Sequence, residues 1–564
     1  MANITLLIND LSSGELSPKL EGAVDHPSYL SGCRIMENFI PMKPRGFRTI
    51  PGSYYCGAAP GSGRLVPWYA KNGTYAAELT NALARFWKLD DTTHATTLVM
   101  PYTAAQLAAV QWKLINNELY LVHAGYAPRK IDDGGGNPAL STPTFTGAKT
   151  FAATGAYPSI IGVNQGRLML GATDEEPNGL FQSRAPNSTG YRLTDFTAGV
   201  NPDDAIFTYQ SDGFGSRLRW VMANRRVAAG ADMSVWMDAG GFATPTAFYM
   251  SVASFCNCAG VQAVALDNGM LYIGGPTPSL HLLLYSQESG GLIDMDLTRD
   301  SDHILLPGVV EMAVQVNPEP VVWIVRSDGQ LVGCSLQISP AGVKMGWGRR
   351  VCADGGLVES ACVLRTSSLD RLYMMVNRGG TRQIERFEFL DDSDYTEIHY
   401  VDNGLRKTPA SATVTGLDHL NGKTVHAIAD GSSMPEKVVA GGSVTYGRVV
   451  QKIHIGQPYT SECLPQRPEI PINATWQGKK KRVEKTMARL YRSCGGRIGQ
   501  PEQATEDMQR LTYEPFITPT PFTGDKEITL SGQVTTDGAV KIVRDEPFPL
   551  TVLAITSRIA IMES

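Results

Sequence analysis

The sequence predicts a mainly β protein, with a β-propeller-like body of short antiparallel blades, a C-terminal β-sandwich- or barrel-like region and an extended N-terminal arm. The chain has 57 glycines and 34 prolines among 564 residues, more of both than average proteins contain, which favours many turns and few long helices. Short apolar runs follow polar turns along most of the chain. They recur roughly every 40 to 60 residues, close to the blade period of β-propellers.

Composition and charge exclude several classes of protein. Hydrophobic residues make up 43% and charged residues 19%, so the bulk of the chain is not disordered. The net charge is −5, whereas proteins that grip nucleic-acid phosphates are normally basic. No run of 18 apolar residues predicts a membrane helix. No basic region precedes the apolar residues 4–8, so we expect no secretory signal peptide.

Residues 1–60 are dense in turn formers and show no clear periodicity. This pattern predicts an extended arm rather than a packed domain. The apolar members of the arm are expected to pin it either to the body or to a neighbouring subunit; they are Leu16, Tyr29, Phe39, Ile40 and Phe47. If the arm serves docking alone, deletion of residues 1–40 leaves the body folded.

Residues 61–400 are predicted to form the propeller-like domain. Apolar runs bounded by turns predict strands at 65–69, 75–79, 85–89 and 118–123. The same pattern of a turn followed by an apolar run recurs at 166–171, 268–274, 328–333 and 369–376. Radial stacking of four-stranded blades buries both faces of each sheet and leaves only short edges. An array of β-sandwiches is the competing interpretation.

Residues 401–564 are predicted to form a second β-rich region that the N-terminal arm completes. Asp430-Gly431 and Gly441-Gly442 are typical of hairpin turns. An alternating run at 486–491 and an apolar run at 549–555 predict further strands.

The sequence contains none of the common catalytic signatures. It has no Gly-x-x-x-x-Gly-Lys-Ser/Thr loop, no His-Glu-x-x-His and no Gly-x-Ser-x-Gly. The nine histidines occur singly, with no pair at the spacing of metal ligands on a helix. We therefore assign no catalytic, cofactor-binding or metal-binding residues, and we predict that the chain is not an enzyme and has no cofactor.

The nine cysteines are odd in number and scattered. Only Cys256 and Cys258 lie close together, and one residue separates them rather than the two of a zinc or redox pair. We expect reduced thiols in a protein made in the cytosol, with one or two disulfides as an open alternative.

Two kinds of charged motif are candidate functional sites: acidic motifs and one basic run. Carboxylate pairs stand at 175–176, 203–204 and 391–392; they suit glycoside hydrolysis only if two carboxylates meet in space, and solvated turns are the favoured interpretation. The stretches at 211–215 and 327–329 miss the spacing of an aspartate box. The basic run Lys479–Arg482 suits DNA phosphates. A solvated strand end or a contact to an acidic neighbour is favoured for this acidic chain.

A series of short motifs runs through the chain in a fixed order. In the first 60 residues they are LSSGELSP at 11–18, GCR at 32–34, ENFIP at 37–41, PRG at 44–46 and RTIPG at 48–52. Downstream they are MPYT at 100–103, ELYLVH at 118–123, GRL at 166–168, QSR at 182–184, LDHLNGKTV at 417–425 and PFPLTV at 547–552. Over nearly its full length the sequence resembles the tail tubular, or nozzle, proteins of short-tailed bacteriophages. It departs from that family at Gln182, where an aromatic residue is common, and at 274–278, where a longer polar hairpin is usual.

The resemblance implies a structural virion protein of the tail, made in the host cytoplasm and carrying no catalytic residues. It implies a homo-oligomeric ring of six copies below the portal and head-to-tail adaptor proteins, with tail fibre or spike proteins as further partners. Double-stranded DNA would pass through the ring without tight binding during genome retention and ejection. The alternative is a receptor-binding or glycan-cleaving β-propeller tail protein.

Overall fold

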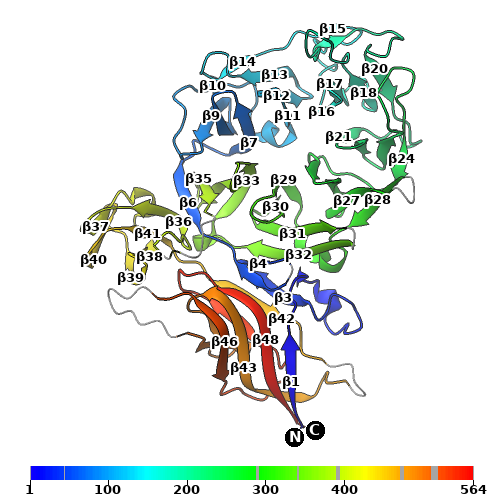
Figure 1. Cartoon of the computed structure of the whole chain (residues 1–564). Coiled ribbons are helices and arrows are strands. Elements are labelled where there is room, and N and C mark those ends of the chain that lie inside the picture. Colours follow the sequence, from blue (N-terminus) through cyan, green and yellow to red (C-terminus); the bar gives the residue numbers. More distant parts are fainter. Residues whose placement is uncertain are drawn as a thin grey trace.

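The computed structural model describes residues 2–43, 45–286, 291–339, 342–388, 394, 396–469, 475–509 and 519–562. These residues contain 48 strands and five short 3-10 helices, which are η1 (Pro18–Leu20), η2 (Ala104–Ala109), η3 (Arg299–Leu305), η4 (Ala353–Gly355) and η5 (Asp418–Leu420). The prediction of a mainly β protein is confirmed. A ring of four-stranded sheets stands above a β-sandwich, and a small β-unit lies to one side (Figure 1). No helix in these ranges is long and apolar enough to cross a membrane.

Seven antiparallel four-stranded sheets form the blades of a β-propeller. The first blade contains β7 (Gly63–Ala70), β8 (Gly73–Thr80), β9 (Leu83–Lys88) and β10 (Leu98–Val99). The second contains β11 (Gln111–Ile115), β12 (Glu118–His123), β13 (Tyr126–Asp132) and β14 (Ala139–Ser141). The third contains β16 (Ile160–Asn164), β17 (Arg167–Gly171), β18 (Gly179–Gln182) and β20 (Ile206–Tyr209), and a parallel pair, β15 (Thr146–Gly147) and β19 (Asp195–Phe196), accompanies it.

The remaining blades continue around the ring. The fourth contains β21 (Leu218–Ala223), β22 (Val227–Ala231), β23 (Val235–Asp238) and β24 (Met250–Ser254). The fifth contains β25 (Val264–Leu266), β26 (Gly269–Gly274), β27 (Ser279–Ser286) and β28 (Gly291–Asp296). The sixth contains β29 (Val309–Gln315), β30 (Val321–Arg326), β31 (Leu331–Ser339) and β32 (Gly342–Arg350). The seventh contains β33 (Leu357–Leu364), β34 (Arg371–Arg378), β35 (Thr381–Phe387) and β6 (Ser53–Ala58).

The seventh blade closes the ring by combining two distant parts of the chain. Its first three strands come from residues 357–387, and its outer strand β6 precedes the first blade. Antiparallel pairing places Phe387 opposite Ser53 and Gln383 opposite Ala58. Because β6 continues almost directly into β7 of the first blade, backbone hydrogen bonds join the two ends of the propeller.

A two-sheet β-sandwich, here called the platform, combines both ends of the chain. One sheet contains β4 (Phe39–Pro41), β5 (Phe47–Thr49), β48 (Thr551–Met562), β43 (Lys480–Ser493) and β46 (Phe522–Thr529), with β1 (Ala2–Ile8) paired to β48. The other contains β2 (Gly14–Glu15), β3 (Gly32–Glu37), β42 (Ser461–Pro465), β47 (Lys541–Arg544), β44 (Arg497–Gly499) and β45 (Glu506–Asp507). Buried apolar side chains from both sheets, among them Met36, Leu490, Ile542 and Ile555, share one core.

The platform is joined to the propeller by a continuous sheet. Strand β32 of the sixth blade pairs with β2 and β3, so ten strands form one sheet from β29 to β45. At the joint, Gly14 has a φ of +66°, and a Cβ added there would lie 2.2 Å from the Trp347 carbonyl oxygen. Glycine is therefore required at this close approach of two backbones.

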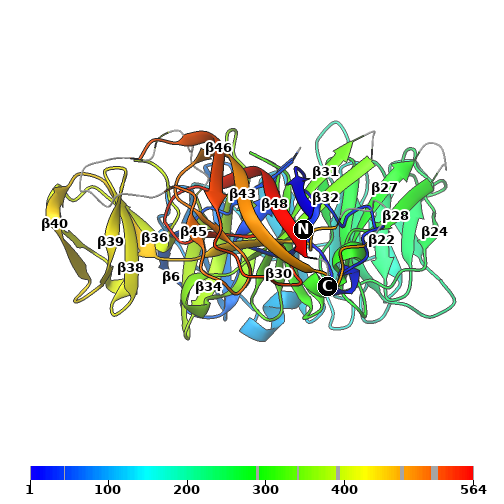
Figure 2. The same ribbon diagram turned by 90° about the horizontal axis from the view of Figure 1, so that it is seen from below.

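A small β-unit lies beside the seventh blade and the platform. One of its sheets contains β36 (Asp402–Lys407), β41 (Ile453–Gln457), β38 (Thr424–Ala429) and β39 (Ser432–Val438), and the other pairs β37 (Ser411–Thr415) with β40 (Ser443–Val450). Val414, Val425 and Ile455 belong to its separate apolar core. Viewed from below, the unit lies at the opposite end of the molecule from β24 (Figure 2).

The structure places residues 1–60 within these sheets rather than in a detached arm. Their apolar side chains are buried within the chain itself: Leu16, Tyr29, Phe39, Ile40 and Phe47 are each at most 4% exposed. Of the two locations considered for these side chains, the body is the one observed. The expectation that deletion of residues 1–40 leaves the body folded stays a prediction, and the presence of Leu11, Met36 and Phe39 in the platform core argues against it.

Candidate functional site

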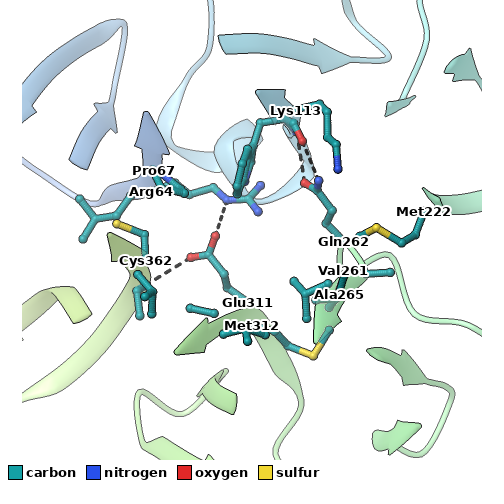
Figure 3. Close-up of a pocket in the computed structure, with 18 of the residues that line it drawn as sticks. Arg64, Pro67, Lys113, Met222, Val261, Gln262, Ala265, Glu311, Met312 and Cys362 are labelled. Carbon is teal, nitrogen blue, oxygen red and sulfur yellow. Dashed lines mark hydrogen bonds and ion pairs between the residues drawn. The ribbon is translucent and has the colours of Figure 1, made fainter. Parts of the chain in front are cut away.

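A partly apolar cavity lies where the first strands of the blades converge. It has a volume of about 370 Å³ and is lined from β7, β11, β25, β29 and β33 (Figure 3). Pro67, Trp112, Met312 and Val363 supply apolar surface. This volume suits a small molecule. It is far too small to hold a DNA duplex.

A buried ion pair crosses one side of this cavity. Arg64 on β7 donates from Nε to Oε1 of Glu311 on β29 at 2.8 Å, and the two side chains are 10% and 7% exposed. Arg64 also donates to the carbonyl oxygens of Leu107 and Val110. Oε2 of Glu311 accepts from Ser360 Oγ at 2.6 Å. The pair links the first and sixth blades, and these contacts satisfy both charged groups.

A side-chain amide crosses the cavity in another direction. Trp112 on β11 donates its backbone N–H to Gln262 Oε1 at 3.1 Å, and Gln262 Nε2 donates to the Trp112 carbonyl at 2.7 Å. Gln262 precedes β25, so it binds the second blade to the fifth as a strand backbone would. Figure 3 shows both bridges across the cavity. They close the propeller axis to a passing polymer.

The cavity offers few groups for chemistry. Glu311 is the one carboxylate among its lining residues, and it is held in the ion pair with Arg64. Lys113 is half-buried and burial lowers its pKa. In the described part of the chain, the side chain of Lys113 makes no hydrogen bond or ion pair. Glycoside hydrolysis by the usual mechanism needs two carboxylates, and the lining residues of this cavity supply one of them, Glu311.

Three members of the carboxylate pairs singled out in the sequence bind polar or basic side chains away from this cavity; they are Glu176, Asp203 and Asp204. Asp203 contacts Arg184 and Arg192, at 3.1 and 2.7 Å. Asp204 is buried and lies 3.0 Å from Arg184. Lys149 and the Tyr209 hydroxyl both bind the Glu176 carboxylate.

The other charged candidates from the sequence lie in turns or outside the described residues. Glu175 is exposed at a turn, where its backbone N–H donates to the Gly155 carbonyl. The pair at 391–392 lies outside the described residues. The stretches 211–215 and 327–329 lie in separate turns, so those charged candidates that the structure describes do not form one site.

The basic run at 479–482 does not act as one surface patch. Lys481 is 1% exposed, and its Nζ donates to the Thr536 carbonyl at 3.3 Å. Lys480 and Arg482 point to the opposite, exposed side of β43 and have no hydrogen-bond or ion-pair partner among the described residues. Strand alternation therefore divides the run between the core and the surface.

The exposed face of β43, β46 and β48, here called the platform face, carries charges of both signs. Lys485 binds Glu527 at 2.7 Å, and Arg489 binds Asp525 at 2.7 Å. Arg558 lies 3.4 Å from Glu484. Lys485, Arg489 and Arg558 are thus paired with carboxylates, whereas the side chains of Lys480 and Arg482 have no such partner among the described residues. Such a surface offers little unpaired positive charge to DNA phosphates.

Sequence reasoning missed the residues that cross the propeller axis. Arg64, Gln262 and Glu311 stand in no recognised motif, and they are separated by about 50 to 250 residues in the chain. A charged residue at the start of an apolar run, as in Arg64 before Leu65 and Val66, is the only local signal. Their convergence follows from the ring closure.

The chain has distant structural neighbours among solved proteins. No family model matches the chain, and no curated protein matches it. Among solved structures it is similar to the Neurospora crassa Pan2 WD40 domain, with TM-score 0.36, 8% identity, and coverage of 62% of this chain and 98% of that one. It is also similar to Chaetomium thermophilum Raptor, with TM-score 0.38, 9% identity, and coverage of 61% of this chain and 29% of that one. The N-terminal domain of Nup159 gives TM-score 0.34, 10% identity, and coverage of 63% and 99%. We base the blade assignment on the strand order itself.

Proposed function

We propose that this chain is a structural subunit of the tail nozzle of a short-tailed bacteriophage. Six copies form a ring below the portal and adaptor, and the genome passes through the centre of that ring. The identity rests on the ordered sequence motifs that resemble this family. In this proposal the chain is not an enzyme, and its partners are further copies of itself, the adaptor, and tail fibre or spike proteins.

The structural observation that carries the proposal is the ten-stranded sheet that runs from the sixth blade into the platform. Backbone hydrogen bonds along this sheet couple the propeller and the platform without a flexible linker, which suits a wall element that must resist pressure. The closed propeller axis supports the same role, because any DNA channel must then lie between subunits rather than through one of them.

The platform face supports a channel that does not hold DNA tightly. Three of its cations are paired with carboxylates, Lys480 and Arg482 have no partner among the described residues, and the whole chain is acidic, with a net charge of −5. Sliding requires few lasting phosphate contacts, since each neutralised phosphate adds salt-dependent affinity.

Duplex binding by the purified chain tests this part of the proposal. Fluorescence anisotropy with a 30-base-pair duplex at physiological salt should give a dissociation constant no tighter than roughly 1 μM, the range of non-specific binding. The variant with Lys480→Ser and Arg482→Ser should weaken this residual binding, and Lys485→Ser, which removes a paired lysine, serves as the control. Nanomolar binding by the parent chain contradicts a sliding surface.

The axial cavity favours one alternative, a receptor-binding or glycan-cleaving tail protein. A ligand there would contact Trp112 and Lys113. Release of reducing sugar from bacterial surface polysaccharide by the purified chain, abolished in Glu311→Gln, would establish that alternative. No turnover, together with a ring of this chain in virions, supports the nozzle.

A further inference from the structure

A compact cluster of polar side chains lies between the outer strands of the fourth and fifth blades, away from the axial cavity. Cys256 follows β24, His281 is on β27 and Asp294 is on β28. One ligand or reactive atom from each lies within 4.8 Å of the other two. Each of the three residues is partly exposed, so a small reagent reaches the cluster from solvent.

The contacts run in sequence from the thiol to the carboxylate. Cys256 Sγ lies 3.7 Å from His281 Nε2, within the range of a sulfur hydrogen bond. His281 Nδ1 lies 2.8 Å from Asp294 Oδ1. A nucleophile, an imidazole and a third group that orients the imidazole are the arrangement that activates a thiol.

Asp294 is positioned to orient His281 rather than to bind a ligand directly. Its Oδ2 accepts a hydrogen bond from the Tyr272 hydroxyl at 2.8 Å, and its Oδ1 is engaged by the imidazole. The ring of Tyr272 also stacks on His281, with centroids 5.0 Å apart and 29° between the planes. Both carboxylate oxygens are therefore occupied, which fixes the imidazole with Nε2 toward the sulfur.

Charge in the cluster agrees with this geometry. Burial lowers the pKa of His281, but the hydrogen bonds to Asp294 and Cys256 outweigh burial and raise that pKa to about 10. Burial raises the pKa of Asp294, and the contacts with His281 and Tyr272 outweigh it and lower that pKa. The imidazolium and the carboxylate thus stabilise each other beside the sulfur. Ser279 Oγ, 3.0 Å from His281 Nε2, competes with Cys256 for the same nitrogen.

We propose that Cys256, His281 and Asp294 form a reactive-thiol site that takes small disulfides. The Cys256 thiolate attacks one sulfur of the disulfide, a new S–S bond forms as the old one breaks, and the second sulfur leaves as a thiolate. The His281 imidazolium supplies a proton to that leaving thiolate. Asp294 is a positioning residue. The site does not depend on the nozzle role proposed above.

Two reagents on the folded, reduced full chain test this site. Iodoacetamide at pH 7, followed by quantitative peptide mass spectrometry, measures the alkylation rate of each cysteine, and oxidised glutathione measures mixed-disulfide formation. Cys56 is the internal reference, because the residue is also partly exposed but burial and the Asp91 carboxylate, 3.4 Å from its sulfur, raise the pKa of its thiol. Cys256 should react about tenfold faster than Cys56 with both reagents.

Variants separate activation from simple exposure. His281→Gln should lower the Cys256 rate about tenfold and leave the Cys56 rate unchanged. Asp294→Asn should lower the Cys256 rate, and Asp294→Glu should restore part of it. His123→Gln, in the second blade, is the matched control and should change neither rate. Ser279→Ala keeps the pair intact and should hold or raise the Cys256 rate, which provides a test if His281→Gln does not fold.

Three results would overturn the proposal. The first is a Cys256 rate no faster than that of Cys56. The second is an unchanged Cys256 rate in folded His281→Gln or a lower one in folded Ser279→Ala. The third is stoichiometric zinc binding that Asp294→Asn abolishes, since Asp294 would then be a metal ligand rather than a positioning residue.

Discussion

Asp402 reinforces the joint between the propeller and the small β-unit, where β36 pairs with β6. It is fully buried; Arg350 Nη2 donates to it at 2.8 Å and Arg378 Nη2 at 3.2 Å. The Ala353 backbone N–H donates at 2.6 Å, and the Ser53 hydroxyl also donates. These partners come from the sixth blade, the seventh blade and the strand that closes the ring.

Replacing this carboxylate should destabilise the joint strongly. Asp402→Asn leaves two buried guanidinium groups with less compensating charge, and we expect the free energy of unfolding to fall by about 3–5 kcal/mol. Asp354→Asn is the control, because Asp354 and its partner Lys423 are 46% and 48% exposed and such a pair is worth at most about 1 kcal/mol. Urea denaturation followed by circular dichroism measures both. Equal effects of the two substitutions would contradict the role assigned to Asp402.

The sequence does not reveal this network in advance. Ser53, Arg350, Arg378 and Asp402 belong to four separate segments, and none stands in a motif. A buried charge costs free energy unless it is paired. The pairing of these residues depends on the tertiary fold and is therefore not visible in the sequence. The same holds for Cys256 and His281, whose 25-residue separation carries no recognised spacing.

At the scale of elements, the recurring sequence pattern of a turn followed by an apolar run corresponds to the second strand in most blades. The runs at 118–123, 166–171, 268–274 and 369–376 contain the second strands of their blades, β12, β17, β26 and β34. The run at 328–333 instead enters β31, a third strand. Central strands are buried on both faces and therefore carry the strongest apolar signal. Outer strands, such as β10 and β14, are short and weakly patterned, which is why the number of blades was not predictable.

The N-terminal strands provide a test of how the elements depend on one another. Deletion of residues 1–40 removes Leu11, Met36 and Phe39 from the platform core, and each large buried side chain lost costs about 2–5 kcal/mol. We expect this variant to lose the cooperative unfolding transition of the platform. Circular dichroism melts and limited proteolysis measure the loss.

Deletion of residues 1–8 is the matched control. It removes β1, an edge strand paired only with β48, and should leave a folded chain. A folded platform after deletion of residues 1–40 would restore the interpretation of this segment as a detachable arm.

The small β-unit should be sensitive to mild acid. Burial lowers the pKa of His419 and of His426 to about 4, and burial together with the neighbouring His399 lowers that of His454 to about 3. The unfolded chain takes up these protons near pH 6.5, whereas the folded unit resists them. Their stabilisation is therefore complete above pH 6.5 and is lost as the pH falls toward 4, by about 1.4 kcal/mol per pH unit for each histidine.

Urea denaturation between pH 7 and pH 4.5 measures this dependence. His454→Asn should reduce the slope. His281, whose pKa is raised to about 10, acts in the opposite direction, because its stabilisation is complete below about pH 6.5 and is lost as the pH rises from there toward 10. A free energy of unfolding that stays constant between pH 7 and pH 5 contradicts the neutral, buried state of these histidines.

At the scale of the whole molecule, the chain is built so that its parts support one another. The first and last residues of the described chain meet in β1 and β48, the propeller closes through β6, and one sheet spans propeller and platform. The sequence predicted the β-rich body and the second β-region, because alternation and turn residues are local signals. Strand pairings across hundreds of residues have no such local signal.

The position of this chain in a virus particle tests the central claim most directly. Cryo-electron microscopy of virions that carry it should show six copies in a closed ring below the portal and adaptor, with density for DNA on the axis between subunits. A virion that lacks the chain, or a chain that occurs as single copies on fibres and cleaves surface glycans, would contradict the claim.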